Sequence, residues 1–257
     1  VNGVQDYMLM KFNHLGVKQW TKLKGTSSTD APYGLTIDSS NNLYSFGAYD
    51  GEHTTSSNHS NSTDIRVVKH DSGGNFQWVK KLDNSSLITQ GGDYVKIDSS
   101  GNIFTGGGDT VVKFNSSGVK QWEVSQTGGQ GIVLDSSGNV YVSEDIWTGD
   151  NVTLTKYNSS GSKQWSQTLS SSENDYVEGI TIDSSDNIFI TGQTSGEFDG
   201  NTHVGNSDAF LIKYDSSGNK QWTKQIGTST YEKGRSVTTD TNGNIYLTGE
   251  TMGSLDG

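Results

Sequence analysis

One segment of about fifteen residues occurs five times along this chain of 257 residues. Its clearest copy is Asp208–Trp222, and every copy ends in a Gln-Trp pair. The copies end at Trp20, Trp78, Trp122, Trp165 and Trp222, at intervals of 43 to 58 residues. Self-similarity on this scale is typical of repeat architectures, in which each repeat is one supersecondary unit that packs against its neighbours. The chain is therefore predicted to be a repeat protein.

Each repeat contains four short strand-like runs, which we call strands A to D. In the clearest copy they cover residues 179–183, 187–192, 209–214 and 219–224. β-Branched and aromatic residues dominate these runs, and clusters of Ser, Asn, Asp and Gly separate them, as expected for strands joined by turns. Four antiparallel strands per repeat are compatible with a blade of a β-propeller or with part of a long barrel.

The A–B and C–D connections use one turn sequence throughout. Asp or Asn opens each turn, and Gly, Asn or Asp stands three residues later. The opening residues are Asp38, Asp98, Asp135, Asp183 and Asp240 for A–B, and Asn13, Asp71, Asn115, Asn158 and Asp215 for C–D. The first side chain can accept the N–H two residues on, and the fourth residue tolerates a positive φ. These ten connections are predicted to be tight hairpins.

Side-chain size favours the propeller over the barrel. Strand A carries small residues such as Gly34, Gly131 and Gly179, strand B carries one aromatic residue per copy, and strand D carries the recurring Trp. Blades arranged around an axis are crowded at their inner strands and spread apart outwards, so their side chains should grow from the inner to the outer strand. A barrel gives no reason for this gradient.

The phase of the repeats predicts how the ring closes. The chain opens with a C–D pair, Tyr7–Leu23, and ends with an A–B pair, Gly234–Gly249. Pairing the two would complete a blade and leave no free sheet edge. We therefore predict an all-β fold over residues 1–257, a single five-bladed β-propeller of four-stranded antiparallel blades. Its fifth blade is shared between residues 1–24 and 234–257.

The composition of the chain excludes several classes of binding partner. The formal net charge of −11 argues against nucleic acid, which rewards basic surfaces, and against electrostatic binding to anionic lipid. The sequence holds no apolar run of the length that crosses a membrane, so membrane insertion is not expected. Cysteine is absent, which rules out disulfides and Cys-ligated metal.

The repeats resemble a known family. The run Asp208–Trp222 followed by Gly234–Gly249 is similar to the bacterial β-propeller repeat often labelled SBBP. The sequence Asp215-Ser-Ser-Gly-Asn-Lys-Gln-Trp222 also resembles the Trp-docking turn of quinoprotein-like propellers. The resemblance covers essentially the whole chain. It implies a secreted or cell-surface bacterial protein, in which the propeller works alone or in an array with neighbouring domains, and it brings no shared catalytic motif.

The five recurring Trp residues have two interpretations. They could form sugar-stacking platforms, as in a multivalent lectin. Because each is in phase with a turn, packing between blades is the favoured interpretation. A Lys precedes an aromatic residue or His70 in each C strand, and its side chain is expected to lie over a neighbouring residue rather than to bind an anionic ligand.

Residues at the entrance to strand A differ from copy to copy, while the strand behind them stays constant. If strand A is innermost, these residues face the mouth of the central channel. They are Tyr33, Asp93, Gln130, Glu178 and Arg235. The B–C and D–A connections also vary, including 106–109 and 125–130, and share one face of a propeller. Trp147 and Tyr231 lie on these connections and are further ligand-binding candidates.

Three acidic residues stand just before strand A in three copies. Asp30, Asp175 and Glu232 are weak candidates for a metal site, and Ca²⁺ is the ion that such oxygen donors would take. The alternative is that they are solvated acids capping the D–A turns. No cofactor is predicted. Catalytic motifs are absent, and only a carboxylate pair such as Asp93 with Glu178 could support glycoside hydrolysis.

These observations support one leading hypothesis and two others. The leading hypothesis is a non-enzymatic extracellular interaction or structural module that binds a surface protein or glycan through its variable-loop face. The alternative is a multivalent lectin-like propeller, since near-equivalent blades would offer avidity. A carbohydrate-active hydrolase is the third.

Overall fold

The structure is a computed structural model, and it describes residues 6–24, 30–49, 64–82, 94–145 and 151–255. These residues form eighteen β-strands, and no helix occurs among them. All strand pairs within the sheets are antiparallel. The chain divides into two compact units, residues 1–105 with 111–123, and residues 106–110 with 124–257. The all-β prediction is confirmed.

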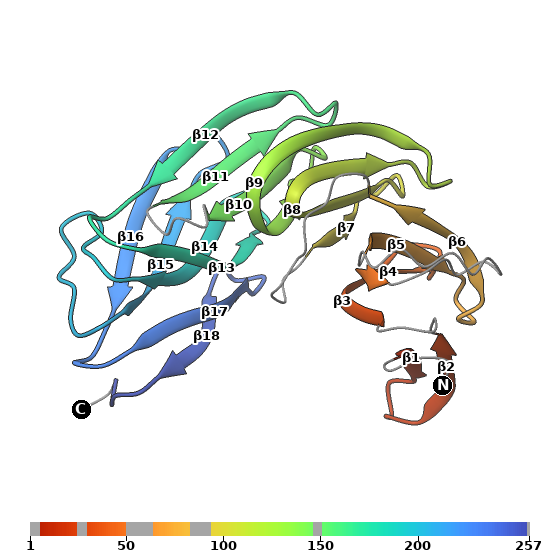
Figure 1. Cartoon of the computed structure of the whole chain (residues 1–257), viewed down its shortest axis with the longest axis horizontal. Coiled ribbons are helices and arrows are strands. Elements are labelled where there is room, and N and C mark those ends of the chain that lie inside the picture. The colour runs from red at the N-terminus through yellow and green to blue at the C-terminus, as the bar shows by residue number, and fades with distance from the viewer. Residues whose placement is uncertain (1–5, 25–29, 50–63, 83–93, 146–150, 256–257) are drawn as a thin grey trace. The chain divides into compact units, whose positions relative to one another are not determined.

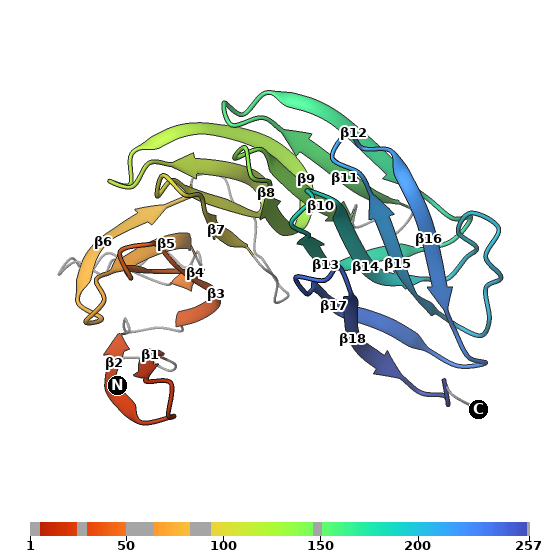
Figure 2. The same ribbon diagram turned by 180° about the vertical axis from the view of Figure 1, so that it is seen from behind.

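Two sheets have the four-stranded meander that was predicted for a blade. One contains β3 (Asp30–Ile37), β4 (Leu43–Tyr49), β5 (Asp64–His70) and β6 (Phe76–Lys81). The other contains β13 (Asp175–Ile182), β14 (Ile188–Thr194), β15 (Asp208–Tyr214) and β16 (Lys220–Ile226). In both sheets each strand pairs with the next one along the chain, and Figures 1 and 2 show β13 to β16 side by side. Strands A to D of the repeat are therefore the four strands of one blade.

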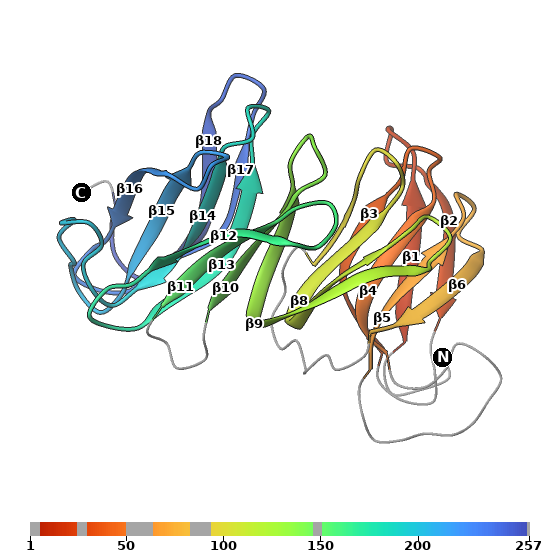
Figure 3. The same ribbon diagram turned by 90° about the horizontal axis from the view of Figure 1, so that it is seen from above.

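The middle of the chain departs from the predicted strand boundaries. A six-stranded sheet has the order β12-β11-β10-β9-β8-β7. Its strands are β7 (Val95–Ile97), β8 (Ile103–Phe114), β9 (Lys120–Leu134), β10 (Val140–Asp145), β11 (Val152–Tyr157) and β12 (Lys163–Leu169). Residues 106–109 and 125–130 were predicted as connections, but they lie inside the long strands β8 and β9 (Figure 3). Both segments are short, rich in Gly and free of Pro, so the backbone stays extended where longer connections leave the sheet.

The two ends of the chain form half-blades. We use this name for β1 (Tyr7–Phe12) with β2 (Lys18–Lys24), and for β17 (Glu232–Thr239) with β18 (Ile245–Thr251). Each pair forms its own two-stranded sheet, and no closed sheet is formed by the described strands. The blade number, the closure of the ring and the single domain over residues 1–257 therefore stay predictions.

The ten hairpin turns are confirmed. The fourth residue of every turn has a positive φ, whether it is Gly, Asn41 or Asp186. In the turn between β13 and β14, Oδ1 of Asp183 accepts the N–H groups of Ser185 and Asn187, each at 2.9 Å. Oδ2 of Asp183 accepts the side-chain amide of Asn187 at 2.8 Å. The turns are thus held by bonds among neighbouring residues, which is why the sequence reveals them.

A stack of one aromatic residue, one Trp and one Lys occurs in both four-stranded sheets and twice in the six-stranded sheet. In the blade β13–β16, Phe189 of strand B is 2% exposed, and the Trp222 ring lies 6.2 Å from it. The ammonium group of Lys213 lies 5.4 Å from the centre of the Phe189 ring, within the range of a cation–π contact. The other stacks contain Tyr44 with Trp78 and Lys69, Phe104 with Trp122 and Lys113, and Tyr141 with Trp165 and Lys156.

Several of these Trp rings also lie beneath the C–D turn of the next blade. A Cβ atom added to Gly218 would come within 2.9 Å of the Trp165 ring. Gly74 has the same relation to Trp20, and Gly118 lies almost as close to Trp78. Glycine at the turn therefore provides a positive φ and also leaves room for the Trp of the preceding blade.

Candidate functional site

The variable residues at the entrance to strand A share a backbone feature that the sequence did not reveal. In β13, Val177 pairs with Gly192 and Gly179 pairs with Thr191, so Glu178 between them is the extra residue of a β-bulge. Tyr33, Gln130 and Arg235 occupy the same position in β3, β9 and β17. A bulge bends the strand and re-aims the side chain of the extra residue. Asp93 and Trp147 lie outside the described residues.

Glycines on strand B accompany three of these bulges. Gly47, Gly192 and Gly249 face a backbone carbonyl of strand A so closely that an added Cβ atom would overlap it. The bulged backbone therefore approaches strand B in a way that only Gly accommodates. A Gly three residues after the strand B aromatic is the sequence signal that could have predicted three of the four bulges, since Glu144 holds this position opposite the bulge at Gln130.

The bulge residues of β13 and β17 meet in a cluster of ion pairs. The guanidinium group of Arg235 donates to Oε2 of Glu178 at 3.0 Å and to Oε1 of Glu250 at 2.8 Å. The ammonium group of Lys233 pairs with Oε1 of Glu178. The side chains of Lys233 and Glu178 are 12% and 16% exposed, whereas those of Arg235 and Glu250 are 39% and 54% exposed. Lys233 and Glu178 are therefore largely shielded from solvent, whereas Arg235 and Glu250 form the exposed rim of the cluster.

Tyr231 adds an aromatic residue next to this cluster. Its hydroxyl donates to Oε1 of Gln193 in β14 at 2.5 Å, and its side chain is half-buried. Burial, followed by the negative charges of Glu250 and Glu178, raises the pKa of Tyr231, and Arg235 partly offsets this effect. The hydroxyl therefore stays protonated and is a hydrogen-bond donor at neutral pH. Two of the residues that the sequence singled out, Glu178 and Arg235, are therefore in direct contact. Tyr231 is close enough for their charges to affect its pKa.

The other described candidates lie in different surroundings. Tyr33 is half-buried and packs against an apolar cluster that includes Phe46, Tyr94 and Val95. Gln130 is half-buried in β9. The same bulge thus presents an apolar contact in β3 and a charged contact in β13 and β17.

The three acidic metal candidates are buried, not solvated. Oδ2 of Asp175 accepts the N–H of Ser171 at 2.7 Å, and Oδ1 accepts the hydroxyls of Ser171 and Thr194 at 2.9 Å and 2.6 Å. Asp175 and Asp30 are 0% and 3% exposed. Asp175 caps its D–A connection, as the alternative interpretation expected, but the expectation of a solvated position was wrong. Backbone and hydroxyl donors replace the lost water.

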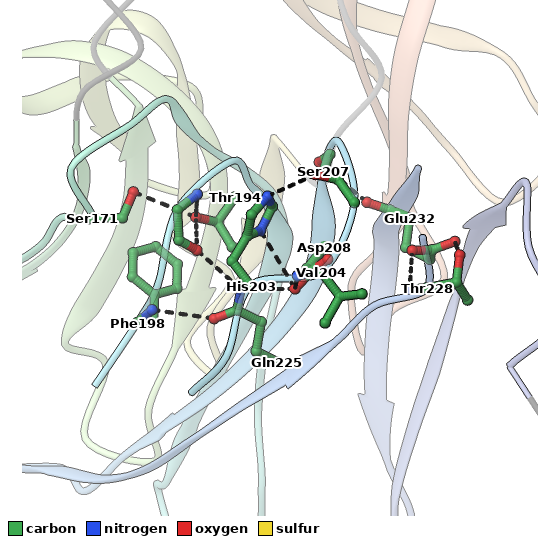
Figure 4. A network of polar contacts seen from close by, with 12 residues as sticks. Ser171, Thr194, Phe198, His203, Val204, Ser207, Asp208, Gln225, Thr228 and Glu232 are labelled. Atoms are coloured by element: carbon green, nitrogen blue, oxygen red, sulfur yellow. Dashed lines mark hydrogen bonds and ion pairs between the residues drawn. The ribbon is translucent and has the colours of Figure 1, made fainter. Parts of the chain in front are cut away.

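Glu232 has the same role in β17 (Figure 4). Its carboxylate accepts the N–H and the hydroxyl of Thr228, both at 2.6 Å, and the hydroxyl of Thr251 at 2.9 Å. Burial alone would raise the pKa of Glu232, but these hydrogen bonds outweigh it, so the pKa is lowered. Within the described ranges, no group of three or more His, Cys, Asp or Glu could hold a metal ion. The donors around Asp175 and Glu232 support a structural role.

The B–C connection of residues 195–207 is closed by its own polar network. Oδ2 of buried Asp208 accepts the N–H of Val204 at 3.1 Å and the amide of Gln225 at 2.8 Å, and His203 lies 3.5 Å away (Figure 4). Phe198 is 1% exposed and packs edge-on against Phe210. Phe198 therefore anchors this connection to the blade, while much of the rest of it, including Val204, is exposed. The sequence did not indicate that the side chains of Asp208 and Gln225 hold this connection.

No helix of the described structure is long and apolar enough to cross a membrane. The carboxylate pair given as an example for the hydrolase hypothesis consists of Asp93, which lies outside the described residues, and Glu178, whose carboxylate pairs with Lys233 and Arg235.

A relative and two solved structures are similar to this chain. An uncharacterized WD repeat-containing protein of Acanthamoeba polyphaga mimivirus is 31% identical over 98 residues, which are 32% of this chain and 7% of that protein. A glucose dehydrogenase matches with a TM-score of 0.51 and 13% identity, over 86% of this chain and 78% of the other. A functionally unknown protein from Desulfotomaculum acetoxidans matches with a TM-score of 0.53 and 12% identity, over 87% and 63%. At these identities the two structures indicate the fold alone.

Two segments match a family model. They are residues 164–199 and 221–256, and the model is that of the SBBP β-propeller repeat. Each segment starts in strand D of one blade and runs through strands A and B of the next. These two segments are therefore similar to the SBBP β-propeller repeat.

Proposed function

We propose that this protein is a non-enzymatic interaction module and that its partner binds at the bulged edge of β13 and β17. The observation that carries the proposal is the contact between Glu178 and Arg235, which lie 57 residues apart in sequence. Repeated blades need the same packing residues at every copy, and these two positions differ in charge. Tyr and Arg at a partly open edge are also the residue types that most often anchor partners.

The surroundings of the cluster support binding over catalysis. Glu178 has two cationic partners, and Arg235 has two carboxylate partners. Such mutual pairing engages each charged group but leaves hydrogen-bonding capacity at the exposed Arg235 and Glu250. The partner is a protein or glycan at a bacterial cell surface. This location rests on the resemblance of the repeats to those of secreted and surface-anchored proteins.

The proposal also includes the closed five-bladed ring. Tyr246 of β18 is 56% exposed, whereas its equivalents Tyr44, Phe104, Tyr141 and Phe189 are at most 2% exposed. The half-blade β1–β2 carries the Lys11 and Trp20 that would complete a stack on Tyr246, as well as exposed Met8 and Met10. The Gly16 turn has open space where the equivalent turns of β5–β6 and β15–β16 meet a Trp, and Trp222 is the ring that would lie there. Closure would thus cover both half-blades.

The test of the binding function is a variant with Arg235→Ala and Glu178→Gln. Labelled protein would be applied to an immobilised outer-surface fraction of the producing bacterium and to a glycan array. We expect binding by the wild type and a loss of at least tenfold in the double variant. Glu123→Gln is the matched control, because it removes a surface ion pair with Lys120 outside the cluster. Equal binding by the double variant and the wild type would reject the bulged edge as the site.

A further inference from the structure

The charges of the β13–β17 cluster balance. We use this name for Glu178, Gln193, Tyr231, Lys233, Arg235 and Glu250. Two carboxylates face two cations, and each charged group has a partner of opposite sign. The cluster therefore has no net formal charge, although the chain carries −11.

This balance limits the ligands that the cluster can accept. An anionic ligand would meet Glu178 and Glu250, and a cationic ligand would meet Lys233 and Arg235, so either would lose in repulsion much of what it gains in attraction. A purely apolar ligand would have to remove the exposed ends of Arg235 and Glu250 from water without replacing their hydrogen bonds. A neutral ligand with many hydrogen-bonding groups avoids both costs.

Donors and acceptors alternate over short distances in the cluster. The guanidinium group of Arg235 lies between the carboxylates of Glu178 and Glu250, at 3.0 Å and 2.7 Å. Because Oε1 of Gln193 accepts the Tyr231 hydroxyl, the NH₂ group of the Gln193 amide remains a donor. A hydroxyl group donates one hydrogen bond and accepts others, so a pair of neighbouring hydroxyls matches a carboxylate beside a guanidinium group.

The equivalent positions of other blades do not repeat the cluster. The strand registers place Ala31, Tyr33 and Ala48 of β3 and β4 where β17 and β18 have Lys233, Arg235 and Glu250. In β9 the bulge residue is Gln130. A site made from these residues therefore occurs once in the described blades, which differs from the multivalent lectin expected from near-equivalent repeats.

The geometry points to a single site for a neutral oligosaccharide at the β13–β17 cluster. This inference rests on the proposed binding function and names its partner class. Sugar hydroxyls would bond to Arg235, Glu250 and the Gln193 amide, and the C–H face of a pyranose ring would pack on the half-buried Tyr231 ring. The face of an aromatic ring is partially negative and attracts the C–H groups of a sugar.

The experiment uses an array of neutral oligosaccharides, with sialylated and uronic acid-containing oligosaccharides as the comparison set. We expect the wild type to bind a neutral glycan and titration calorimetry to give one site per chain. Arg235→Ala should weaken this binding at least tenfold. Tyr231→Phe, which removes only the hydroxyl bonded to Gln193, should weaken it severalfold, and Glu123→Gln should leave it unchanged. Far-UV circular dichroism would show whether each variant is folded.

The outcomes separate this inference from the function on which it rests. If no neutral oligosaccharide binds, or if binding is stronger to acidic glycans, the inference is wrong. If the array is blank but Arg235→Ala abolishes binding to the outer-surface fraction, the proposed function stands and the partner is a protein. A stoichiometry of several sites per chain would overturn the single site in favour of the multivalent lectin. Binding that survives in both Arg235→Ala and Tyr231→Phe would place the sugar elsewhere.

Discussion

The blade β13–β16 and the half-blade β17–β18 begin with the same two strands but bury them differently. Phe189 is 2% exposed, whereas Tyr246 at the same position of β18 is 56% exposed. Both blades have the same A–B turn and the same bulge. The difference is that β15 and β16 supply Lys213 and Trp222 to the Phe189 stack. Local geometry is therefore complete in two strands, while burial of the aromatic residue needs all four.

The largest expected effect tests this difference directly. Phe189→Ala should lower the free energy of unfolding by about 3–5 kcal/mol, since it removes a fully buried ring and leaves a cavity. If β1–β2 completes the fifth blade, Tyr246→Ala should cost a similar amount. If Tyr246 stays exposed, its loss should be within about 0.5 kcal/mol. Urea denaturation of both variants measures the comparison, and a small effect at Tyr246 would contradict ring closure.

Gly→Ala substitutions in the hairpin turns also test the difference between complete blades and half-blades. Gly218→Ala should destabilise the protein by about 2–4 kcal/mol, because Ala resists a φ of +86° and its Cβ would collide with Trp165. Gly138→Ala has open space and should cost only about 1–2 kcal/mol, from the positive φ alone. Gly16→Ala should resemble Gly218→Ala if the ring closes over Trp222. Thermal melts of the three variants measure this, and a Gly16 result equal to that of Gly138 would argue against closure.

The smallest expected effect concerns the A–B turns, which should be alike in both regions. Asp183→Ala should cost about 1 kcal/mol, since it removes bonds to Ser185 and Asn187. Asp183→Asn should cost less, because Asn158 holds the equivalent C–D turn with its Oδ1 atom. Asp240→Ala should act in the same direction, since Asp240 makes the same turn bonds.

The pH dependence of the Asp183 turn follows from its pKa. Burial raises the pKa of Asp183, but hydrogen bonds from Asn187 and Ser185 outweigh burial and lower it. The stabilisation is therefore fully present above the unfolded-state pKa of about 3.9 and is lost as pH falls through the lower native pKa. The difference in stability between wild type and Asp183→Asn should shrink as pH falls from about 5 to 2. A difference that stays constant over this range would rule out ionised Asp183 as its source.

Much of the fold could be predicted because its signals are local. A turn that opens with Asp183 and carries a positive φ at Asp186 involves only consecutive residues, and the same holds for all ten turns. The predicted strand boundaries were wrong at residues 106–109 and 125–130, because no local signal there distinguishes a short connection from a continuing strand. Segments rich in Gly permit both, and the neighbouring strands decide between them.

The candidate site was predicted as a set of positions but not as an arrangement. Variation at Glu178 and Arg235 against a constant strand A marked them as candidates. Their contact depends on the packing of two blades, and Lys233, Gln193 and Glu250 join them only through that packing. The burial of Asp175 likewise depends on donors from Ser171 and Thr194.

The sequence by itself determined the all-β repeat, its four-stranded unit and its hairpin turns, because each rests on periodicity or on bonds between near neighbours. Only the tertiary structure decided that the variable residues are bulge residues, that Glu178 and Arg235 share a charge-balanced cluster, and that Phe189 is buried in a four-stranded sheet whereas Tyr246 belongs to a two-stranded one. The physical reason is the sequence separation of the residues that interact. Turn bonds span two to four residues, whereas the ion pair of the cluster joins residues 57 positions apart, and no local pattern encodes such a contact.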